Sequence, residues 1–291
     1  MRLLVIGLGY SAAAVAAQLR PAAEAITATR RHAEGPRPDG IDRMIAFDGN
    51  APSPDLADAL AEATHLLLSA PPDEAGDPLL NHHREALEAS GTLRWIGYLS
   101  TVGVYGDAGG GWVDERKPPA PSTQRSRNRL AAEDAWRVLG EGAGVPVAIL
   151  RLAGIYGPGR SALDALKAGT ARRIVKPGQV FNRIHRDDIA GWTARLAGKA
   201  VGGTFNLCDD EPAPPQDVVS FAARLAGCPV PEALAFEEAG LSPMGRSFYG
   251  ETKRVSNRAI RQATGREPLY PSYREALLAQ IREEGPAGQS G

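Results

Sequence analysis

The chain has 291 residues, which is enough for one large or two modest domains. Its composition, with 43% hydrophobic and 23% charged residues, is typical of a globular protein. Its net charge of −1 gives no global field to recruit nucleic acid, and no apolar run reaches the length of a membrane span. We therefore expect the protein to bind neither nucleic acid nor a membrane. Cys208 and Cys228 are too few for a disulfide framework, and the apolar run at residues 3–6 is too short for a signal peptide. These features predict a cytoplasmic protein without a metal site.

The first expected element is a short apolar strand, which leads through a Gly-x-Gly-x-x-Ala turn into an Ala-rich helix. In this pattern Gly7 permits the tight turn, Gly9 lets the backbone approach a pyrophosphate, and Ala12 lets the helix pack on the strand. The free N–H groups and positive dipole end of the helix then hold the phosphates. A strand before the turn and a helix after it favour a dinucleotide site over an ordinary glycine-rich turn. The predicted contacts are Gly7, Gly9, Tyr10, Ser11 and Ala12.

Strand and helix patterns alternate through the first half of the chain, which predicts a parallel sheet with helices on both faces. The expected strands are Leu3–Ile6, Ala25–Thr29, Arg43–Phe47, His65–Ser69, Leu93–Leu99 and Val147–Leu150. The expected helices are Ala12–Leu19, Asp55–Ala63, Leu79–Ala89 and Thr123–Leu139. Residues 30–40 are rich in Pro, Gly and charge, so we expect a loop there in place of a crossover helix.

The second half is less regular and is punctuated by proline and glycine. Its expected elements are helices at Arg160–Lys167, Asp187–Ala197, Pro215–Leu225 and Tyr273–Arg282, and a strand at Thr204–Leu207. We predict a Rossmann core over residues 1–160, a smaller substrate lobe interleaved with it over 161–284, and a disordered tail over 285–291. The fold class is therefore α/β, a doubly wound parallel sheet with a small C-terminal α/β lobe.

The tip of the second strand indicates which nicotinamide cofactor binds. An acid there binds the ribose hydroxyls of NAD, whereas an arginine accommodates the 2′-phosphate of NADP. The strand ends in Arg30 and Arg31 with no acid, and two guanidiniums can hold a phosphate, so we favour NADP over NAD. Asp48, after the third strand, is a candidate acceptor for the adenine amine. Ser69, Ala70 and Pro71 end the fourth strand and should lie along the cofactor.

Four segments in order resemble the extended, epimerase/dehydratase-like branch of the short-chain dehydrogenase/reductase superfamily. Tyr98–Gly106 resembles its fifth strand and catalytic serine loop, and Asn128–Glu133 resembles its active-site helix. Leu150–Gly159 resembles its sixth strand and following loop, and Arg183–Ala190 resembles the start of a late helix. The likeness runs from residue 1 to about residue 282. It implies a nicotinamide cofactor and a small-molecule substrate, and it places Leu152 and Ala153 against the cofactor.

The chemistry of that branch uses a Tyr and a Lys four residues apart on one helix face, and a Ser or Thr that holds the substrate oxygen. The Ser/Thr position corresponds to Thr101, with Ser100 beside it. The Tyr position falls at Arg125 and the Lys position at Arg129, so the usual proton relay is missing. An arginine cannot serve as an acid or base at pH 7. The chain therefore resembles atypical members of the branch.

Three interpretations follow from the missing tyrosine. Arg129 holds the nicotinamide ribose or another anion, as the lysine would. Another residue supplies the proton, with Tyr105, Tyr156 and His185 as candidates, of which the last two also serve as candidate substrate contacts. Alternatively there is no hydride chemistry, and the protein binds NADP as a sensor or interaction module.

Several arginines near the expected site predict an anionic substrate. Arg125 and Arg129 share a helix face, and with Arg151 and Arg160 they could form a cationic pocket. The equally weighted alternative is pairing with the acids Asp114, Glu115, Glu133 or Asp134. We also expect Asp187 or Asp188 to cap the helix that follows, and His82 and His83 to lie on a solvated face. Residues 107–122 form either a mobile lid or an ordinary surface loop.

Taken together, the residues and the resemblance predict an NADP-dependent oxidoreductase or epimerase/dehydratase-like enzyme. Its substrate would be small and possibly anionic, with Thr101, Ser100, Arg129 and Tyr105 at the reaction centre. Arg125, Tyr156, Arg160 and His185 would contact the substrate. The protein would be a monomer or a homodimer.

Overall fold

The computed structural model describes residues 1–32 and 34–284; the predicted disordered tail lies outside the described residues. Its centre is a sheet of seven parallel strands in the order β3-β2-β1-β4-β5-β7-β11. The strands are β1 Arg2–Ile6, β2 Ala25–Arg30, β3 Arg43–Ala46, β4 His65–Leu68, β5 Trp95–Thr101, β7 Val147–Leu152 and β11 Gly203–Leu207. The order reverses direction between β1 and β4, and ligands of such sheets bind outside the carboxyl ends of the strands at this point. The predicted doubly wound α/β fold is confirmed.

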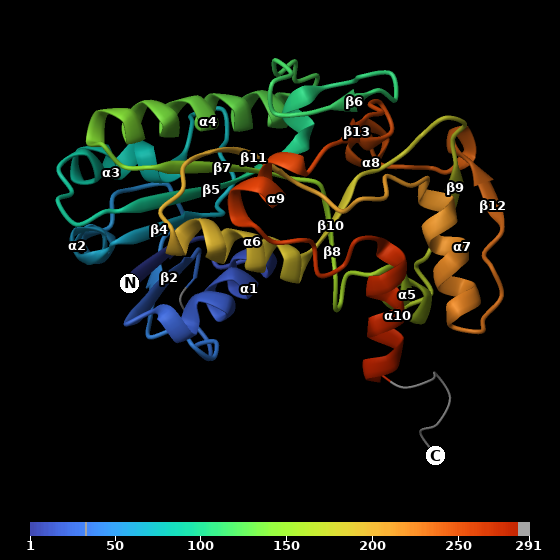
Figure 1. Ribbon diagram of the computed structural model, residues 1–291, viewed down its shortest axis with the longest axis horizontal. Coiled ribbons are helices and arrows are strands. Elements are labelled where there is room, and N and C mark those ends of the chain that lie inside the picture. The colour runs from blue at the N-terminus through green and yellow to red at the C-terminus, as the bar shows by residue number, and fades with distance from the viewer. Residues whose placement is uncertain (33, 285–291) are drawn as a thin grey trace.

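Helices cover both faces of this sheet (Figure 1). One face carries α2 Pro54–Glu62, α3 Pro78–Glu88 and α4 Gln124–Ala143, and the other carries α1 Tyr10–Leu19 and α6 Arg186–Gly198. Successive strand residues point to opposite faces, so Tyr98 packs in the cluster with α4 whereas Leu99 packs in the cluster with α1 and α6. Both faces are therefore apolar, as expected for a parallel sheet.

Side-chain caps and glycine define the ends of the helices near the site. Asp77 precedes α3 and accepts hydrogen bonds from the N–H groups of Leu79 and Leu80. Thr123 caps α4, and Gly144 ends that helix in the left-handed conformation that glycine adopts without strain. Between β2 and β3, residues 31–32 and 34–42 contain no helix, as the Pro- and Gly-rich sequence predicts.

The smaller part of the structure follows the carboxyl ends of the strands, at the right of Figure 1. Its short strand pairs are β8 Gly154–Tyr156 with β10 Arg183–His185, β9 Arg173–Val175 with β12 Ala233–Ala235, and β6 Trp112–Val113 with β13 Arg254–Val255. Its helices are α5 Ala162–Lys167, α7 Pro215–Leu225, α8 Pro243–Phe248, α9 Arg258–Thr264 and α10 Tyr273–Glu284, of which α9 packs back on α6. The sequence predicted α5, α7 and α10, but strands of two or three residues carry no readable period. In the described part of the chain, no helix is long and apolar enough to cross a membrane.

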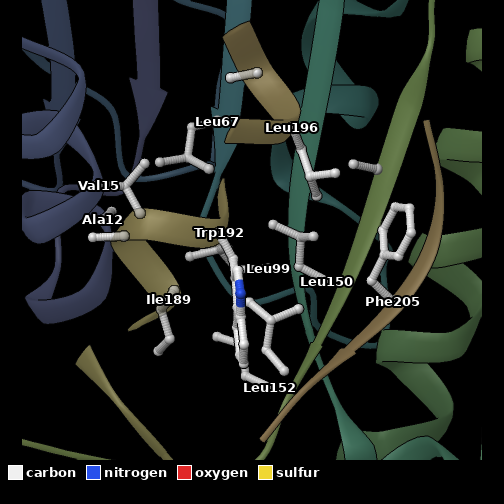
Figure 2. Packing of buried hydrophobic residues seen from close by; sticks show 14 of the residues in the cluster. Ala12, Val15, Leu67, Leu99, Leu150, Leu152, Ile189, Trp192, Leu196 and Phe205 are labelled. Atoms are coloured by element: carbon white, nitrogen blue, oxygen red, sulfur yellow. The ribbon is translucent and has the colours of Figure 1, made fainter. Parts of the chain in front are cut away.

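Trp192 is the central side chain between α6 and the sheet (Figure 2). It is fully buried and lies among residues of α1, β5 and β7, such as Ala12, Leu99 and Leu152. Its indole N–H donates to the carbonyl oxygen of Arg266 at 3.0 Å, so the polar atom is satisfied. This packing fixes α6 beside α1, the helix that begins at the glycine turn.

Replacing Trp192 by Ala should lower the free energy of unfolding by about 3–5 kcal/mol, because it leaves a large cavity and an unpaired carbonyl. Urea denaturation measures this change. Val138→Ala is the control, because Val138 is 64% exposed on α4 and its truncation should change stability by less than about 0.5 kcal/mol. A loss below about 1 kcal/mol for Trp192→Ala would contradict the assigned packing.

Candidate functional site

The turn between β1 and α1 is held against two neighbouring strand ends. The N–H of Gly7 donates to Thr29 Oγ1 at 2.9 Å, and the N–H of Leu8 donates to the Thr29 carbonyl at 2.8 Å. Gly7 has φ +84°, and a Cβ placed on it would lie 2.9 Å from the backbone nitrogen of Ala70. Only glycine fits both the conformation and the space. The turn, the tip of β2 and residues 69–71 after β4 thus meet at one place.

The N-terminus of α1 has the features of an anion site. Gly9 precedes the helix in an extended conformation, and nothing lies within 4 Å of the position that a Cβ would take there. No side chain caps the helix, and its first turn contains no acid. Its first N–H groups and positive dipole end therefore remain available to a phosphate. Behind the turn, Ser11 and Ala12 are buried against the sheet.

The tip of β2 carries the two arginines predicted to distinguish NADP from NAD. Arg30 is half-buried, Arg31 is exposed, and neither side chain has a hydrogen-bond or ion-pair partner among the described residues. The N–H of Phe47 donates to the Arg30 carbonyl, which brings Asp48 beside this tip. The backbone N–H and side-chain amide of Asn50 bind the Asp48 carboxylate and lower its pKa.

Thr101 ends β5 with its hydroxyl oriented by the next turn. Its Oγ1 accepts from the Gly103 N–H at 3.1 Å, which leaves the hydroxyl proton free to donate to another group. Ser126 of α4, which the sequence did not point to, contacts the same turn at Gly103. Ser126 Oγ and Thr101 Oγ1 lie 2.9 and 3.3 Å from the point that a Cβ of Gly103 would occupy. The sequence feature that could have identified Ser126 is its position directly after Arg125, the residue at the tyrosine position of the branch.

Ser100, next to Thr101, points to the other side of the sheet and into a buried ionic network. Its hydroxyl donates to Glu133 Oε1 at 2.5 Å, and Arg151 donates to both oxygens of Glu133. Glu133 is fully buried and Arg151 is 3% exposed. Of the two alternatives for Arg151, the pairing with Glu133 is confirmed and the place in an open cationic pocket is wrong. Arg137 Nη2 also donates to Glu133 Oε2 at 2.9 Å.

Tyr105 belongs to the same buried network. It is fully buried, its hydroxyl donates to Asn206 Oδ1 at 2.8 Å, and the Arg151 guanidinium lies 4.8 Å from its ring centroid. Burial raises the pKa of its phenol. These contacts give Tyr105 a structural role, and we propose no catalytic step for it.

The two arginines on α4 differ in surroundings. Arg129 Nη1 donates to the Leu99 carbonyl at 2.8 Å and to the Tyr98 hydroxyl at 3.2 Å. The cation at the lysine position therefore does contact a tyrosine, but burial raises the pKa of Tyr98, so its hydroxyl stays protonated. Arg125 is exposed and lies over the Phe248 ring of α8, with its Cζ 5.4 Å from the centroid.

Tyr156 and His185 lie together in the smaller part of the structure. Their ring centroids are 5.2 Å apart, and both line a cavity of about 130 Å³ that also contacts Tyr270 and α10. Burial lowers the pKa of His185 to about 4, so it is neutral at pH 7. Its Nδ1 accepts from the Asp187 N–H and caps α6, which corrects the expected cap by Asp187 or Asp188. The Asp188 carboxylate instead binds the N–H groups of Leu269 and Tyr270.

Hydrogen bonds join the segment 107–122 and the adjacent Gly106 to the chain near β13. Lys253 Nζ donates to the Gly106 carbonyl at 2.5 Å and to Glu251 Oε2 at 2.6 Å, and the Ser122 hydroxyl donates to Glu251. The N–H of Thr252 donates to Asp107 Oδ1 at 2.7 Å. The loop that follows Thr101 is thus tied at both ends. Sequence reasoning missed Lys253, whose partners are more than 140 residues away or two residues along the chain.

Two side chains outside the site, His83 and Cys208, are buried. His83 is buried and accepts from the Ser53 N–H at 3.2 Å, so the predicted solvated face is wrong for this residue. Cys208 is buried and unpaired, as expected of a small apolar residue. Within residues 1–32 and 34–284, no cluster of His, Cys, Asp or Glu could hold a metal ion.

Asp209 is a buried carboxyl group in the smaller part of the structure. It is 2% exposed, neither side-chain oxygen has a hydrogen-bond partner, and its N–H donates to the Arg183 carbonyl. Burial, only partly offset by the Arg183 charge, raises the pKa of Asp209 to about 8. The folded chain therefore holds a proton that the unfolded chain releases above its ordinary pKa of about 4.

The free energy of unfolding should consequently fall as the pH rises from about 4 towards 8, because the unfolded chain binds fewer protons in that window. Asp209→Asn should flatten this fall, and thermal melts between pH 5 and 8 would show a difference in Tm of about 2 °C per pH unit. Asp217→Asn, which neutralises an exposed carboxylate on α7, should not. Equal slopes for both variants and the unmodified chain would refute the assignment.

Comparison with known proteins gives several similar chains, although no family model matches. Protein YeeZ from Escherichia coli (strain K12) is 31% identical over 245 residues, which cover 79% of this chain and 86% of YeeZ. A functionally unknown conserved protein from Silicibacter pomeroyi DSS is 42% identical, with a TM-score of 0.84 and coverage of 97% and 99% of the two chains.

Two further solved structures carry names that describe a function. A proposed NAD-dependent epimerase/dehydratase from Methylobacillus flagellatus is 27% identical, with a TM-score of 0.69 over 97% of this chain and 98% of that one. The UDP-glucose 4-epimerase from Thermus thermophilus, solved with NAD, is 20% identical, with a TM-score of 0.72 over 95% and 98%. At that identity the second likeness concerns the fold.

Proposed function

The chain belongs to the family of Protein YeeZ, within the epimerase/dehydratase-like branch of the extended short-chain dehydrogenase/reductase superfamily, and from this premise we propose that it is an NADP-dependent enzyme. It would act as an oxidoreductase or epimerase/dehydratase-like enzyme on a small anionic substrate. The observation that carries the proposal is the uncapped N-terminus of α1, with open space above Gly9, at the switch point of the sheet.

The residues around the glycine turn fit a dinucleotide. The free N–H groups of the first turn of α1, at Tyr10, Ser11 and Ala12, would bind the pyrophosphate, and Gly9 would let it approach. Residues 69–71, Leu152 and Ala153 would lie along the cofactor at the carboxyl ends of β4 and β7. The bound nicotinamide would supply or accept a hydride. The fold relatives that are solved with a cofactor contain NAD, so the preference for NADP rests on this chain's own residues.

The preference for NADP rests on the side chains at the tip of β2. Arg30 and Arg31 have no carboxylate or hydrogen-bond partner in the described part of the chain, so both guanidiniums are available to a 2′-phosphate. Asp48, ionised and held by Asn50, would accept a hydrogen bond from the adenine amine and not from a ribose hydroxyl.

The double variant Arg30→Ala/Arg31→Ala should weaken NADPH binding by about 10- to 100-fold, because it removes charge-assisted hydrogen bonds to the 2′-phosphate. Binding of NADH, which lacks that phosphate, should change by less than about twofold. Nicotinamide fluorescence titration measures both. Preferential binding of NADH by the unmodified chain would overturn the NADP assignment, and binding of neither nucleotide would sink the proposed enzyme.

The proposed reaction centre is the carboxyl end of β5. The free hydroxyl proton of Thr101 would bind the substrate oxygen, and Arg129, held by the Leu99 carbonyl, would orient the nicotinamide ribose or the substrate. The exposed guanidinium of Arg125 supports an anionic substrate. The arginine at this tyrosine position also favours a second candidate, an NADP-binding sensor without turnover.

Thr101→Val keeps the shape of the side chain but removes the hydroxyl, so it should lower kcat by about 100-fold while NADPH affinity is retained. A screen of anionic carbonyl compounds for NADPH oxidation provides the substrate for this measurement. Undiminished turnover by the variant would remove Thr101 from the mechanism. NADPH binding with no turnover of any compound in the screen would favour the sensor.

A further inference from the structure

Tyr10, the first residue of α1, carries two guanidinium groups on its ring. The Cζ of Arg160 lies 4.3 Å from the ring centroid, and the Cζ of Arg186 lies 5.1 Å from it. The ring is fixed because its hydroxyl donates to the Pro158 carbonyl at 3.0 Å. Two cations are thus gathered beside the residue whose backbone opens the phosphate-binding helix.

The loop that carries Arg160 packs directly on this residue. Gly157 has φ +143°, and a Cβ placed on it would lie 2.8 Å from the Tyr10 hydroxyl, so only glycine allows the approach. The N–H of Arg160 donates to the Gly157 carbonyl at 2.9 Å and closes the turn. The position of Arg160 relative to α1 is therefore set by the backbone of its own loop.

The two arginines differ in whether a carboxylate balances their charge. Arg186 Nε donates to Asp187 Oδ1 at 3.1 Å, so its charge is largely balanced. The nearby Asp164 binds Ser161 and Gln280. Arg160 is exposed, and in the described part of the chain its side chain has neither a carboxylate partner nor a hydrogen bond. One guanidinium remains uncompensated.

The surroundings of Arg160 favour an anion. Its uncompensated guanidinium and the positive end of the α1 dipole lie near one another, and both attract a negative charge. A guanidinium stacked on an aromatic ring keeps its N–H edges free for bidentate bonds to phosphate oxygens. Tyr10 therefore serves as a platform that orients Arg160 while its donors stay available.

We propose that Arg160 binds the pyrophosphate of the dinucleotide from the side opposite the α1 N–H groups, with Tyr10 positioning its guanidinium. The inference rests on the proposed function, since it requires a dinucleotide at the glycine turn. It replaces the expectation that Arg160 contacts the substrate. The loop 157–160, which follows β8, would then contact the cofactor through Arg160.

The test compares three ligands that share a pyrophosphate: NADPH and NADH by fluorescence, and ADP-ribose, which lacks the nicotinamide, by calorimetry. Arg160→Ala should weaken all three by a similar factor of about 10, because the lost contact is common to them. Arg160→Lys, which keeps the charge but loses the planar fork, should restore part of the affinity. Arg195→Ala is the matched control, since Arg195 is exposed near the other end of α6.

Each outcome has a distinct meaning. Unchanged binding of all three ligands by a folded Arg160→Ala variant overturns the inference, and so does a loss confined to NADPH, which indicates a 2′-phosphate contact. An equal loss in Arg195→Ala also overturns it, because a general change of charge then explains the effect. If the unmodified chain binds none of the three ligands, the proposed function itself fails and this inference falls with it.

Discussion

The approach of Gly7 to the backbone of Ala70 is the contact on which the rest of the site depends. A Cβ at Gly7 would lie 2.9 Å from the Ala70 nitrogen, and the positive φ is itself costly for any other residue. The contact brings the β1–α1 turn against the end of β4, while Thr29 holds the same turn against β2. The N-terminus of α1, the arginines after β2 and the residues after β4 therefore meet at one edge of the sheet.

A second constraint operates inside the sheet. Glu133, fully buried on α4, binds Ser100 of β5 and Arg151 of β7. A buried ion pair is costly to desolvate, but removal of one partner leaves an uncompensated charge, so the three elements are held together once the network forms. Because strand side chains alternate, fixing Ser100 towards α4 leaves Thr101 on the opposite face. The network thus orients the residue that we place at the reaction centre.

The fold was predictable where the signals are local. Alternating apolar strands and helices indicate a parallel sheet. The glycine turn can be recognised because each of its small residues is required by the backbone conformation or close packing of a segment only a few residues long. The partners of charged residues were not predictable. For Arg151 the sequence left an anion pocket and pairing with one of four acids equally open, and only the structure shows that Glu133, 18 residues away in sequence, is the partner. His185 caps α6 because the helix begins at Arg186, which places Asp187 and Asp188 in its first turn and not before it.

Whether the open N-terminus of α1 holds a pyrophosphate can be decided by a crystal structure of the chain grown with NADPH. We expect phosphate density over the free N–H groups of Tyr10 and Ser11, with the adenine ribose at the tip of β2 and the nicotinamide facing Thr101. Density for the nucleotide at another place would contradict this assignment. So would the absence of nucleotide density at saturating NADPH, in a crystal whose neighbouring molecules leave the β1–α1 turn open.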